Sequence, residues 1–509
     1  MMRLPYLRDD GGRQQLTVQE FAGYDHRDPI SPKLFYDTVN MSARRYPTAS
    51  TRAARGTLDY AALTKPHGLI WADGLYWVDG TGLYKDGKKV ADVADSDKLL
   101  VRMAAWLYIW PDKMRYHTID GTVEQLEHSW TGKASFTEST IEANGIDEGF
   151  SVYDGITIEG AGEETNNKTA VCLGVEDGKL IFSDLCFVEE EATVTLRRSV
   201  PDFDLLTELD NRLWGVTKDG HEIRACKLGD PKNWDCYEGL STDSFAATVG
   251  SGGVFTAASS LQGYALLMKE GTIHKMYGTK PSNYQAISQK VRGPLDGAER
   301  SLAEYDEVLY YLSDSGVTAY VGGTPEQIGA QLGEERYVTG VGGAAGDRYW
   351  LSAGKADGSY VMLCYDVGRG IWYKEDDTHA LWMAAGGGKV YYIDADDLRI
   401  HTTEGEDDER VGWAMEWGDM TEGVPEHKHL SRVIVDLRLE AGTSCTIKLR
   451  YDGGEWETVR EISGEAYRRS MPIPIIPRRY ERFAVRLEGE GEMTLWAIER
   501  TVEGSTELG

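Results

Sequence analysis

The chain has 509 residues, enough for about three domains of roughly 150 residues each, and 83 acidic against 54 basic residues give it a formal net charge of −29. This charge argues against general binding to nucleic-acid backbones, which depends on lysines and arginines that neutralise phosphates. The 58 glycines, 15 prolines, 28 tyrosines and 14 tryptophans fit tight turns between aromatic-rich strands, and they exclude collagen, coiled coils and low-complexity disorder.

Neither a membrane segment nor a disulfide framework is predicted. The longest apolar run, 103–110, is far shorter than the roughly 20 residues that cross a bilayer. The N-terminus MMRLPYLRDD lacks the apolar core of a secretory signal. The six cysteines include no Cys-x-x-Cys pair. We therefore expect reduced thiols, a protein made in a reducing cytoplasm, no contact with a membrane and no cofactor.

Residues 1–67 differ from the rest of the chain. They hold ten basic and seven acidic residues, and the stretch from Thr38 to Leu58 contains four arginines and no acidic residue. Apolar periodicity is weak here, which is typical of an extended arm. Because the whole chain is strongly acidic, we expect this N-terminal arm to dock on an acidic surface, either of its own chain or of a neighbouring subunit.

From residue 68 onward, short alternating strands are joined by Gly, Asp or Asn turns. In GLIWADGLYWVDGTGLYKDGKKV (68–90), Asp-Gly pairs at 73–74, 79–80 and 86–87 separate alternating apolar runs, which is a strong hairpin signal. The same pattern recurs in six later segments: 103–126, 206–234, 263–278, 306–328, 346–376 and 380–403.

Seven such units predict an all-β fold class, with a β-propeller of six or seven irregular blades formed by residues 68–126 and 201–403. A four-stranded blade has two apolar faces that it cannot bury alone, so blades pack face to face around an axis. A β-sandwich is the alternative architecture, but it does not require so many similar hairpins in series.

Two further regions accompany the predicted propeller. Residues 127–200 hold 15 acidic and five basic residues, and segments such as SVYDGITIEG predict a small inserted β-domain on the rim. After the acidic run EGEDDER (404–410), residues 410–509 contain four long alternating strands, which predict a C-terminal β-sandwich. Segments with helical periodicity are almost absent throughout.

The sequence carries no strong catalytic motif, because GxSxG, Walker A, HExxH and EF-hand patterns are absent. Residues 313–318 are similar to the Asp-box turn of sialidase propellers, but the aspartate comes one position early and no tryptophan follows. His427 and His429 share one face of a predicted strand without a third ligand, so surface residues are the simpler interpretation than a metal site. We predict no catalytic or metal-binding residues and no enzymatic activity. Because carboxylates are abundant, however, the pair of catalytic carboxylates that a glycosidase uses is not excluded.

Arg44, Arg45, Arg52 and Arg55 are the candidate interaction residues. Docking on a protein neighbour is the favoured interpretation of this cluster, and a solvated loop and contact with phosphate are the alternatives. Phosphate contact is disfavoured because a small basic patch on a chain with a net charge of −29 is repelled by DNA together with the rest of the protein.

Several segments carry a resemblance to a known family. FYDTVNMSARRYPTASTRAARG (35–56), DNRLWGVTKDGHEIRACKLGDPKNW (210–234) and PIPIIPRRYERFAVRLEGEGEMTLWAIERTVEGS (472–505) are similar to bacteriophage virion proteins encoded near the head–tail genes, as are residues 241–256 and 267–284. The chain thus resembles the β-propeller nozzle proteins of short-tailed phages and related tail-associated proteins of prophages in Gram-positive bacteria.

The resemblance implies a structural protein of the virion tail, synthesised in the host bacterial cytoplasm. It implies a cyclic homo-oligomer, with six-fold symmetry as the first expectation, around the channel for DNA ejection. Other tail or head–tail adaptor proteins would be its partners, and an acidic channel would let DNA pass without specific binding. The alternative function is that of a virion protein that binds or degrades glycans at the host surface.

Overall fold

The computed structural model describes residues 13–408, 410–423, 427–465 and 467–504. The chain divides into two compact units: the first comprises Met1–Ala62, Ser315–Thr318 and Glu326–Gly509, and the second comprises Leu63–Asp314 and Ala319–Pro325. Both units are built from strands. The helices of the described part are single 3₁₀ turns, and none of them is long and apolar enough to cross a membrane: Glu164–Asn166, Pro281–Asn283, Glu299–Ser301 and Ala330–Leu332.

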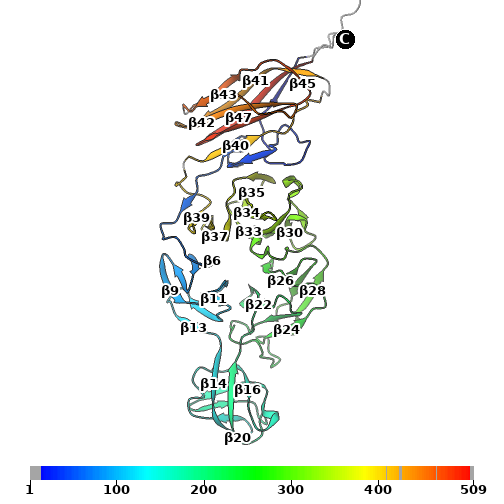
Figure 1. Cartoon of the computed structure of the whole chain (residues 1–509). Coiled ribbons are helices and arrows are strands. Elements are labelled where there is room, and N and C mark those ends of the chain that lie inside the picture. The colour runs from blue at the N-terminus through cyan, green and yellow to red at the C-terminus, as the bar shows by residue number, and fades with distance from the viewer. Residues whose placement is uncertain (1–12, 409, 424–426, 466, 505–509) are drawn as a thin grey trace, which may run out of the picture. The chain divides into compact units, whose positions relative to one another are not determined.

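Seven four-stranded sheets follow one another along the chain, each holding one of the predicted hairpin segments (Figure 1). The first four belong to the second unit, and their strands pair in chain order. They are β6 (Pro66–Trp71), β7 (Leu75–Asp79), β8 (Gly82–Lys85) and β9 (Lys88–Asp92); β10 (Leu99–Met103), β11 (Trp106–Trp110), β12 (Met114–His117) and β13 (Val123–Gln125); β21 (Leu205–Leu209), β22 (Arg212–Val216), β23 (Glu222–Ala225) and β24 (Phe245–Thr248); and β25 (Ala257–Leu261), β26 (Tyr264–Lys269), β27 (Thr272–Tyr277) and β28 (Gln285–Gln289).

The fifth sheet contains residues of both units, and the sixth and seventh belong to the first unit. They are β29 (Ala303–Tyr305), β30 (Val308–Ser313), β31 (Gly316–Tyr320) and β32 (Glu326–Gln327); β33 (Tyr337–Ala345), β34 (Arg348–Lys355), β35 (Tyr360–Asp366) and β36 (Ile371–Lys374); and β37 (Ala380–Gly386), β38 (Lys389–Asp394) and β39 (Ile400–Thr402), completed by β5 (Gly56–Thr57).

Local turn chemistry explains why these strands reverse where they do. Asp86 and Gly87 lie between β8 and β9 and both have positive φ, 49° and 76°. Two consecutive residues with positive φ form the turn whose twist suits a tight hairpin, and Asp-Gly is among the pairs that adopt it readily. The Asp-Gly pairs are therefore a direct physical cause of the meander.

The sheets are apolar on both faces, as the propeller prediction requires. Along β11, Leu107 and Ile109 pack in a core shared with β7 of the preceding sheet, while Tyr108 and Trp110 pack in a core shared with Leu213 of β22. Strands β22 and β26 divide their side chains between two neighbouring cores in the same way. Side chains alternate between the faces of a strand, so each sheet needs a neighbour on both sides. The predicted all-β fold class is confirmed, and the described residues form seven four-stranded sheets of the kind predicted for propeller blades.

The seventh sheet takes its outermost strand from the N-terminal part of the chain. Gly56 and Thr57 of β5 pair with Thr402 and His401 of β39. A Cβ atom on Gly56 would lie 2.7 Å from the Oγ1 of Thr402, so glycine is what permits this close approach. The N-terminal segment thereby completes a blade that residues 380–403 begin.

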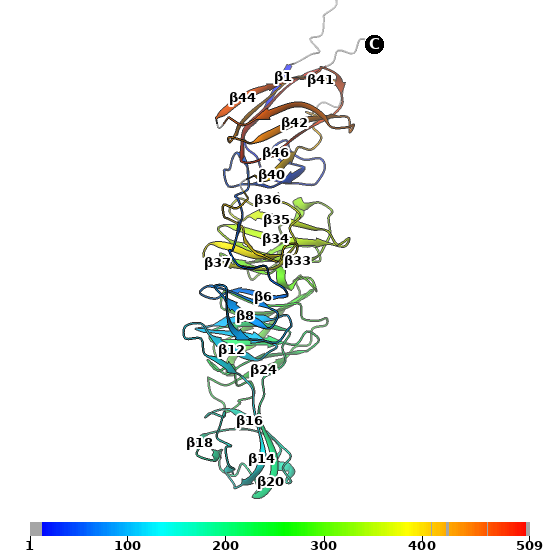
Figure 2. The same ribbon diagram turned by 60° about the vertical axis from the view of Figure 1, so that its left-hand side comes forward.

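Residues 128–198 form the inserted β-domain, a seven-stranded sheet of the second unit with its own core of phenylalanine and isoleucine side chains. β14 and β20 are its long central pair (Figure 2). Its order is β17-β16-β20-β14-β15-β19-β18, with bounds Thr169–Val171, Gly155–Glu159, Glu190–Arg198, His128–Phe136, Thr140–Glu142, Lys179–Ile181 and Gly174–Glu176. At its base, buried Arg198 pairs with buried Asp154 and donates to the carbonyl of Leu126 at 3.0 Å.

The C-terminal β-sandwich is present but is larger than predicted. One sheet has the order β3-β4-β47-β41-β44, with β1 on β47 and β45 on β41, and the other has the order β2-β40-β46-β42-β43 (Figure 2). The bounds are β1 (Arg13–Val18), β2 (Asp37–Val39), β3 (Met41–Ser42), β4 (Ala49–Thr51), β40 (Gly412–Glu416), β41 (Lys428–Leu439), β42 (Ser444–Tyr451), β43 (Glu457–Ser463), β44 (Arg468–Ile473), β45 (Arg479–Tyr480), β46 (Phe483–Glu490) and β47 (Met493–Gly504).

The predicted domain limits need one correction here. Strands β1 to β4 belong to the sandwich, although residues 1–67 were assigned to an arm and only residues 410–509 to the sandwich. Phe21, Phe35 and Met41 are fully buried in the same core as Trp413 and Trp417. These N-terminal strands are two to six residues long, too short for their periodicity to show in the sequence.

Candidate functional site

The four arginines of the N-terminal segment contact carboxylates of their own chain, all within the first unit. Arg44 and Arg45 both pair with Glu492, at 2.9 and 2.5 Å. Arg45 also donates from Nη1 to the Oγ1 of Thr494 at 2.8 Å. These contacts fix the turn between β3 and β4 to the start of β47.

Arg52 and Arg55 lie deeper, in a cluster with the carboxylates of Glu375 and Asp376. Arg55 places Nη2 at 2.8 Å from Glu375 and Nη1 at 2.8 Å from Asp376. Arg52 places Nη2 at 2.8 Å from Asp408 and lies 3.8 Å from Glu375. Burial disfavours a charged guanidinium, yet the carboxylates of Asp376 and Glu375 hold the pKa of Arg55 well above its ordinary value. Both guanidinium groups are therefore engaged in ion pairs within the chain.

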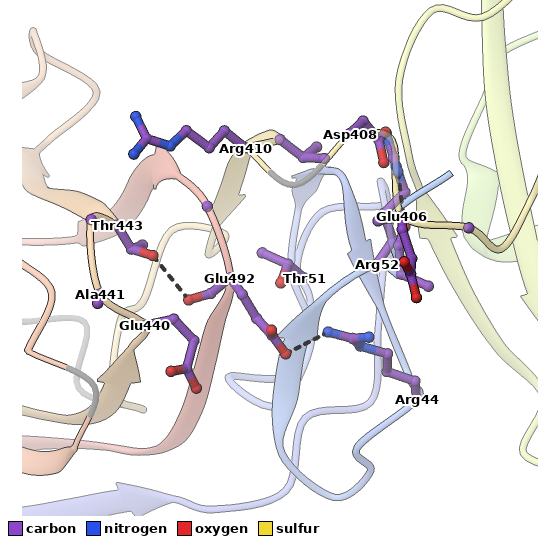
Figure 3. A pocket seen from close by; sticks show the side chains of 16 residues that line it. Arg44, Thr51, Arg52, Glu406, Asp408, Arg410, Glu440, Ala441, Thr443 and Glu492 are labelled. Carbon is purple, nitrogen blue, oxygen red and sulfur yellow. Dashed lines mark hydrogen bonds and ion pairs between the residues drawn. The ribbon is translucent and has the colours of Figure 1, made fainter. Parts of the chain in front are cut away.

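A polar pocket opens beside this cluster, also within the first unit. It has a volume of about 530 Å³ and is bordered by five separate stretches of chain: the β3–β4 turn, the end of β4, the loop before β40, the β41–β42 turn and the β46–β47 turn (Figure 3). Its charged lining consists of Arg44, Arg52, Arg410, Glu406, Asp408, Glu440 and Glu492. Glycines, alanines and two threonines supply most of the remaining wall.

Some of these charged groups are already paired. In Figure 3, Glu492 points at Arg44, and Asp408 lies beside Arg52. Glu440 pairs with Arg438, which is not drawn in this view, at 2.8 Å. These pairs hold the walls of the pocket in place.

Other lining groups retain hydrogen-bonding capacity. The side chains of Arg410 and Glu406 are exposed, and neither has a hydrogen-bond or ion-pair partner within the part of the chain that the structure describes. The Nε of Arg44 is buried without an acceptor, and burial is the main cause that lowers the pKa of this side chain. The pocket therefore offers unpaired donors and an unpaired acceptor to a ligand.

Sequence reasoning found only part of this site. Arg44 and Arg52 were among the predicted interaction residues, but Arg410, Glu440 and Glu492 were not. They lie in turns that are distant in sequence and meet only through sheet pairing, such as that of β4 with β47. The acidic run 404–410, which served above only to mark the start of the sandwich, was a usable signal for Glu406 and Asp408.

The remaining sequence candidates lie elsewhere. The Nε2 of His429 lies 3.3 Å from the carboxylate of Glu503, so the two side chains form a pair. Across residues 13–504, apart from the few that the structure leaves undescribed, no group of three His, Cys, Asp or Glu side chains is arranged to hold a metal ion. The Asp-box-like residues 313–318 span the end of β30, the two-residue turn at 314–315 and the start of β31.

Comparisons with known proteins give no family. No family profile and no curated protein sequence matches the chain. Among solved structures, it is similar to an exo-β-1,3-galactanase of Phanerochaete chrysosporium (9% identity, TM-score 0.22, 58% of this chain and 94% of that one). It is also similar to an engineered GH43 glycoside hydrolase with endo-xylanase and exo-arabinofuranosidase activity (8%, 0.22, 58% and 97%). A third match is PorZ, a surface component of the type-IX secretion system of Porphyromonas gingivalis (10%, 0.26, 80% and 71%).

The prediction that the protein has no enzymatic activity is corrected by these matches. Two of the three structures are glycoside hydrolases, which contradicts that prediction, and it is withdrawn. At TM-scores of 0.22 to 0.26 no residue correspondence is transferred to this chain, so no activity is assigned from the likeness.

Proposed function

We propose that this chain is a carbohydrate-binding protein of a bacteriophage tail, and that its polar pocket takes one or two sugar units of a host-surface glycan. The observation that carries the proposal is the lining of the pocket of about 530 Å³, where the guanidinium of Arg410 and the carboxylate of Glu406 have no partner among the described residues. Small-molecule sites span roughly 300 to 1,000 Å³, so this volume suits a short saccharide.

The chemistry of the lining favours hydroxyl groups over a charged ligand. A guanidinium only donates hydrogen bonds and a carboxylate only accepts them. A sugar hydroxyl does both, so a saccharide can use the donors and the acceptors of this lining alike. Three arginines and four carboxylates line the cavity, a net charge of −1, so a phosphate or sulfate gains little from entering.

A glycan panel tests this proposal. The intact protein is applied to immobilised capsular, teichoic-acid and peptidoglycan-derived saccharides, and the same incubations are analysed for released sugar so that binding and cleavage are scored separately. We expect binding to at least one glycan, weakened at least tenfold by Arg410→Ala or Glu406→Gln, since a hydrogen bond to a charged group contributes about 1.5–3 kcal/mol.

A matched control separates the effect of a pocket side chain from the effect of losing one positive charge. Arg399 is an exposed arginine in the β38–β39 turn of the same unit, outside the pocket. Arg399→Ala changes the net charge as Arg410→Ala does and should leave binding unchanged. Equal loss in both variants, or no binding to any panel glycan, rejects the proposal.

A second candidate function is a structural ring of the tail around the DNA ejection channel. The supporting observation is that residues 35–56 and 472–505, two segments that carry the phage resemblance, pair within one sandwich: β4 pairs with β47 and Ala49 lies opposite Leu495. Electron microscopy of recombinant protein and of particles tests it. Closed rings with a central channel support this candidate, and a monomer that is also absent from purified tails rejects it.

A further inference from the structure

Three side chains of the fourth sheet, in the second unit, form a hydrogen-bonded chain through a buried histidine. His274 lies on β27 directly opposite Ser288 of β28. Its Nδ1 is 2.8 Å from the Oγ of Ser288, and its Nε2 is 2.8 Å from the Oγ of Ser251. The imidazole is fully buried, whereas Ser251 is half-buried on the loop between β24 and β25.

The loop that carries Ser251 is open on its outer side and fixed on its inner side. Its sequence is Gly-Ser-Gly-Gly, and a Cβ atom on Gly250, Gly252 or Gly253 would meet nothing within 4 Å. Beneath the loop, the buried ammonium of Lys269 donates to the carbonyls of Ser251 and Gly253, at 3.0 and 2.7 Å. The serine is thus held in one position next to free space.

Two features suit this loop to acyl transfer. The N–H groups of Gly252 and Gly253 have no acceptor among the described residues, so they are available as donors to an oxyanion. The aromatic ring of Phe255 packs against His274, with ring centroids 5.9 Å apart, and keeps water from one side of the imidazole. A nucleophile, a base and an orienting hydroxyl therefore stand in series.

We propose that Ser251, His274 and Ser288 form a nucleophilic serine site that hydrolyses esters of small acyl groups, such as an O-acetyl group carried by a larger alcohol. The position of Ser251 on a surface loop lets a bulky alcohol remain in solvent while the acyl group meets the serine. This inference uses the second unit only and is independent of the sugar pocket.

The reaction balances without a cofactor. The Oγ of Ser251 bonds to the ester carbonyl carbon and passes its proton to Nε2 of His274, while the Nδ1–H donates to Ser288. The tetrahedral intermediate collapses, the ester C–O bond breaks, and the proton on Nε2 goes to the leaving alcohol. Water then attacks the acyl-serine, Nε2 takes its proton and returns one to Ser251, and the acid is released.

The surroundings of His274 set the expected rate. Burial, with a smaller contribution from the ammonium of Lys269 on β26, lowers the pKa of His274 to about 4. The ring contacts Ser251, Ser288 and Phe255, and within the described part of the chain no carboxylate pairs with it. The imidazole is therefore neutral and able to accept a proton at pH 7, but it is a weak base. Slow turnover is expected, so labelling is measured first.

Covalent labelling with a fluorophosphonate probe tests the site. The intact protein is incubated with the probe at pH 7, digested and examined by mass spectrometry, and hydrolysis of p-nitrophenyl acetate is followed in parallel. We expect one adduct, on the peptide containing Ser251. Ser251→Ala should abolish the adduct, while Ser282→Ala, an exposed serine of the same sheet region, should leave it unchanged.

Two further variants distinguish chemistry from folding. His274→Gln keeps a hydrogen-bonding side chain and should slow labelling by about 10²-fold or more, with the circular dichroism spectrum unchanged. Ser288→Ala removes the positioning hydroxyl and should shift the pH midpoint of labelling. If Ser251 remains unlabelled while a known serine hydrolase in the same tube reacts, or if Ser251→Ala labels as fast as wild type, the proposal is overturned.

Discussion

Replacing Arg55 by methionine is the sharpest perturbation of the N-terminal segment. Arg55 is about 10% exposed, and its partners Glu375 and Asp376 are 6% and 19% exposed. Methionine fills similar space but leaves Arg52, at 3.8 Å from Glu375 and 3.9 Å from Asp376, as the cation that pairs with the two carboxylates. Removing one partner of a buried ion pair costs about 3–5 kcal/mol, because the remaining charge is buried without compensation.

The matched control is Arg45→Met. Arg45 and Glu492 are 41% and 39% exposed, and a pair this exposed contributes about 0–1 kcal/mol. The assay is hydrogen–deuterium exchange of the peptides that contain β5 and β39, because global unfolding of a chain with two units is not a two-state process. We expect Arg55→Met to accelerate exchange there by at least 10²-fold and Arg45→Met to leave it within about fivefold.

Acidification adds a second test of the same cluster. Burial raises the pKa of Asp376, but Arg55 and Arg52 outweigh burial, and the net shift is downward from 3.8. A carboxylate with a lowered pKa stabilises the fold above its unfolded pKa and loses that contribution as pH falls. The difference between wild type and Arg55→Met should therefore shrink below about pH 4. Equal exchange in both arginine variants at pH 7 would refute the assignment of Arg55 to a buried, stabilising pair.

Three further predictions concern other parts of the chain. Because the pKa of His274 is lowered from 6.5 to about 4, the unfolded state takes up the proton at a higher pH than the folded state. As the pH falls from 6.5 to 4, the free energy of unfolding of wild type should therefore decrease by up to ~3 kcal/mol, whereas that of His274→Gln should not show this decrease. Urea unfolding at a series of pH values measures the difference. Asp154→Asn should leave Arg198 as a buried unpaired cation and cost ~3–5 kcal/mol, seen as faster exchange confined to residues 128–198. Gly489→Ala places a Cβ atom 1.9 Å from a backbone carbonyl of β42 and should lower the melting temperature of the sandwich, whereas Gly412→Ala, with open space, should not.

The blades were predictable because their signals are local. Asp-Gly at 86–87 specifies a hairpin within a few residues, and the alternation of Leu107 with Tyr108 in β11 shows two apolar faces without any knowledge of the partner strands. The strands β3, β4 and β5 were not predictable in this way. They are two or three residues long, so no periodicity marks them, and β4 and β5 pair with strands more than 300 residues away in sequence.

The candidate sites show the same limit. Arg44 stood out by its neighbours in sequence, but Glu492 reaches it only through pairing of β4 with β47. His274 and Ser288 meet because the register of β27 and β28 places them opposite each other, and a shift of one residue would point them to opposite faces. Register between strands is set by tertiary packing, which a spacing motif does not report.

The sugar pocket is tested most directly by a crystal structure of the protein with a saturating concentration of a glycan-panel saccharide. The account predicts electron density for a sugar ring between the strand ends and turns around Arg410, with a hydroxyl within about 3 Å of that guanidinium or of the Glu406 carboxylate. A saccharide seated elsewhere on the chain, with this pocket empty, would contradict it.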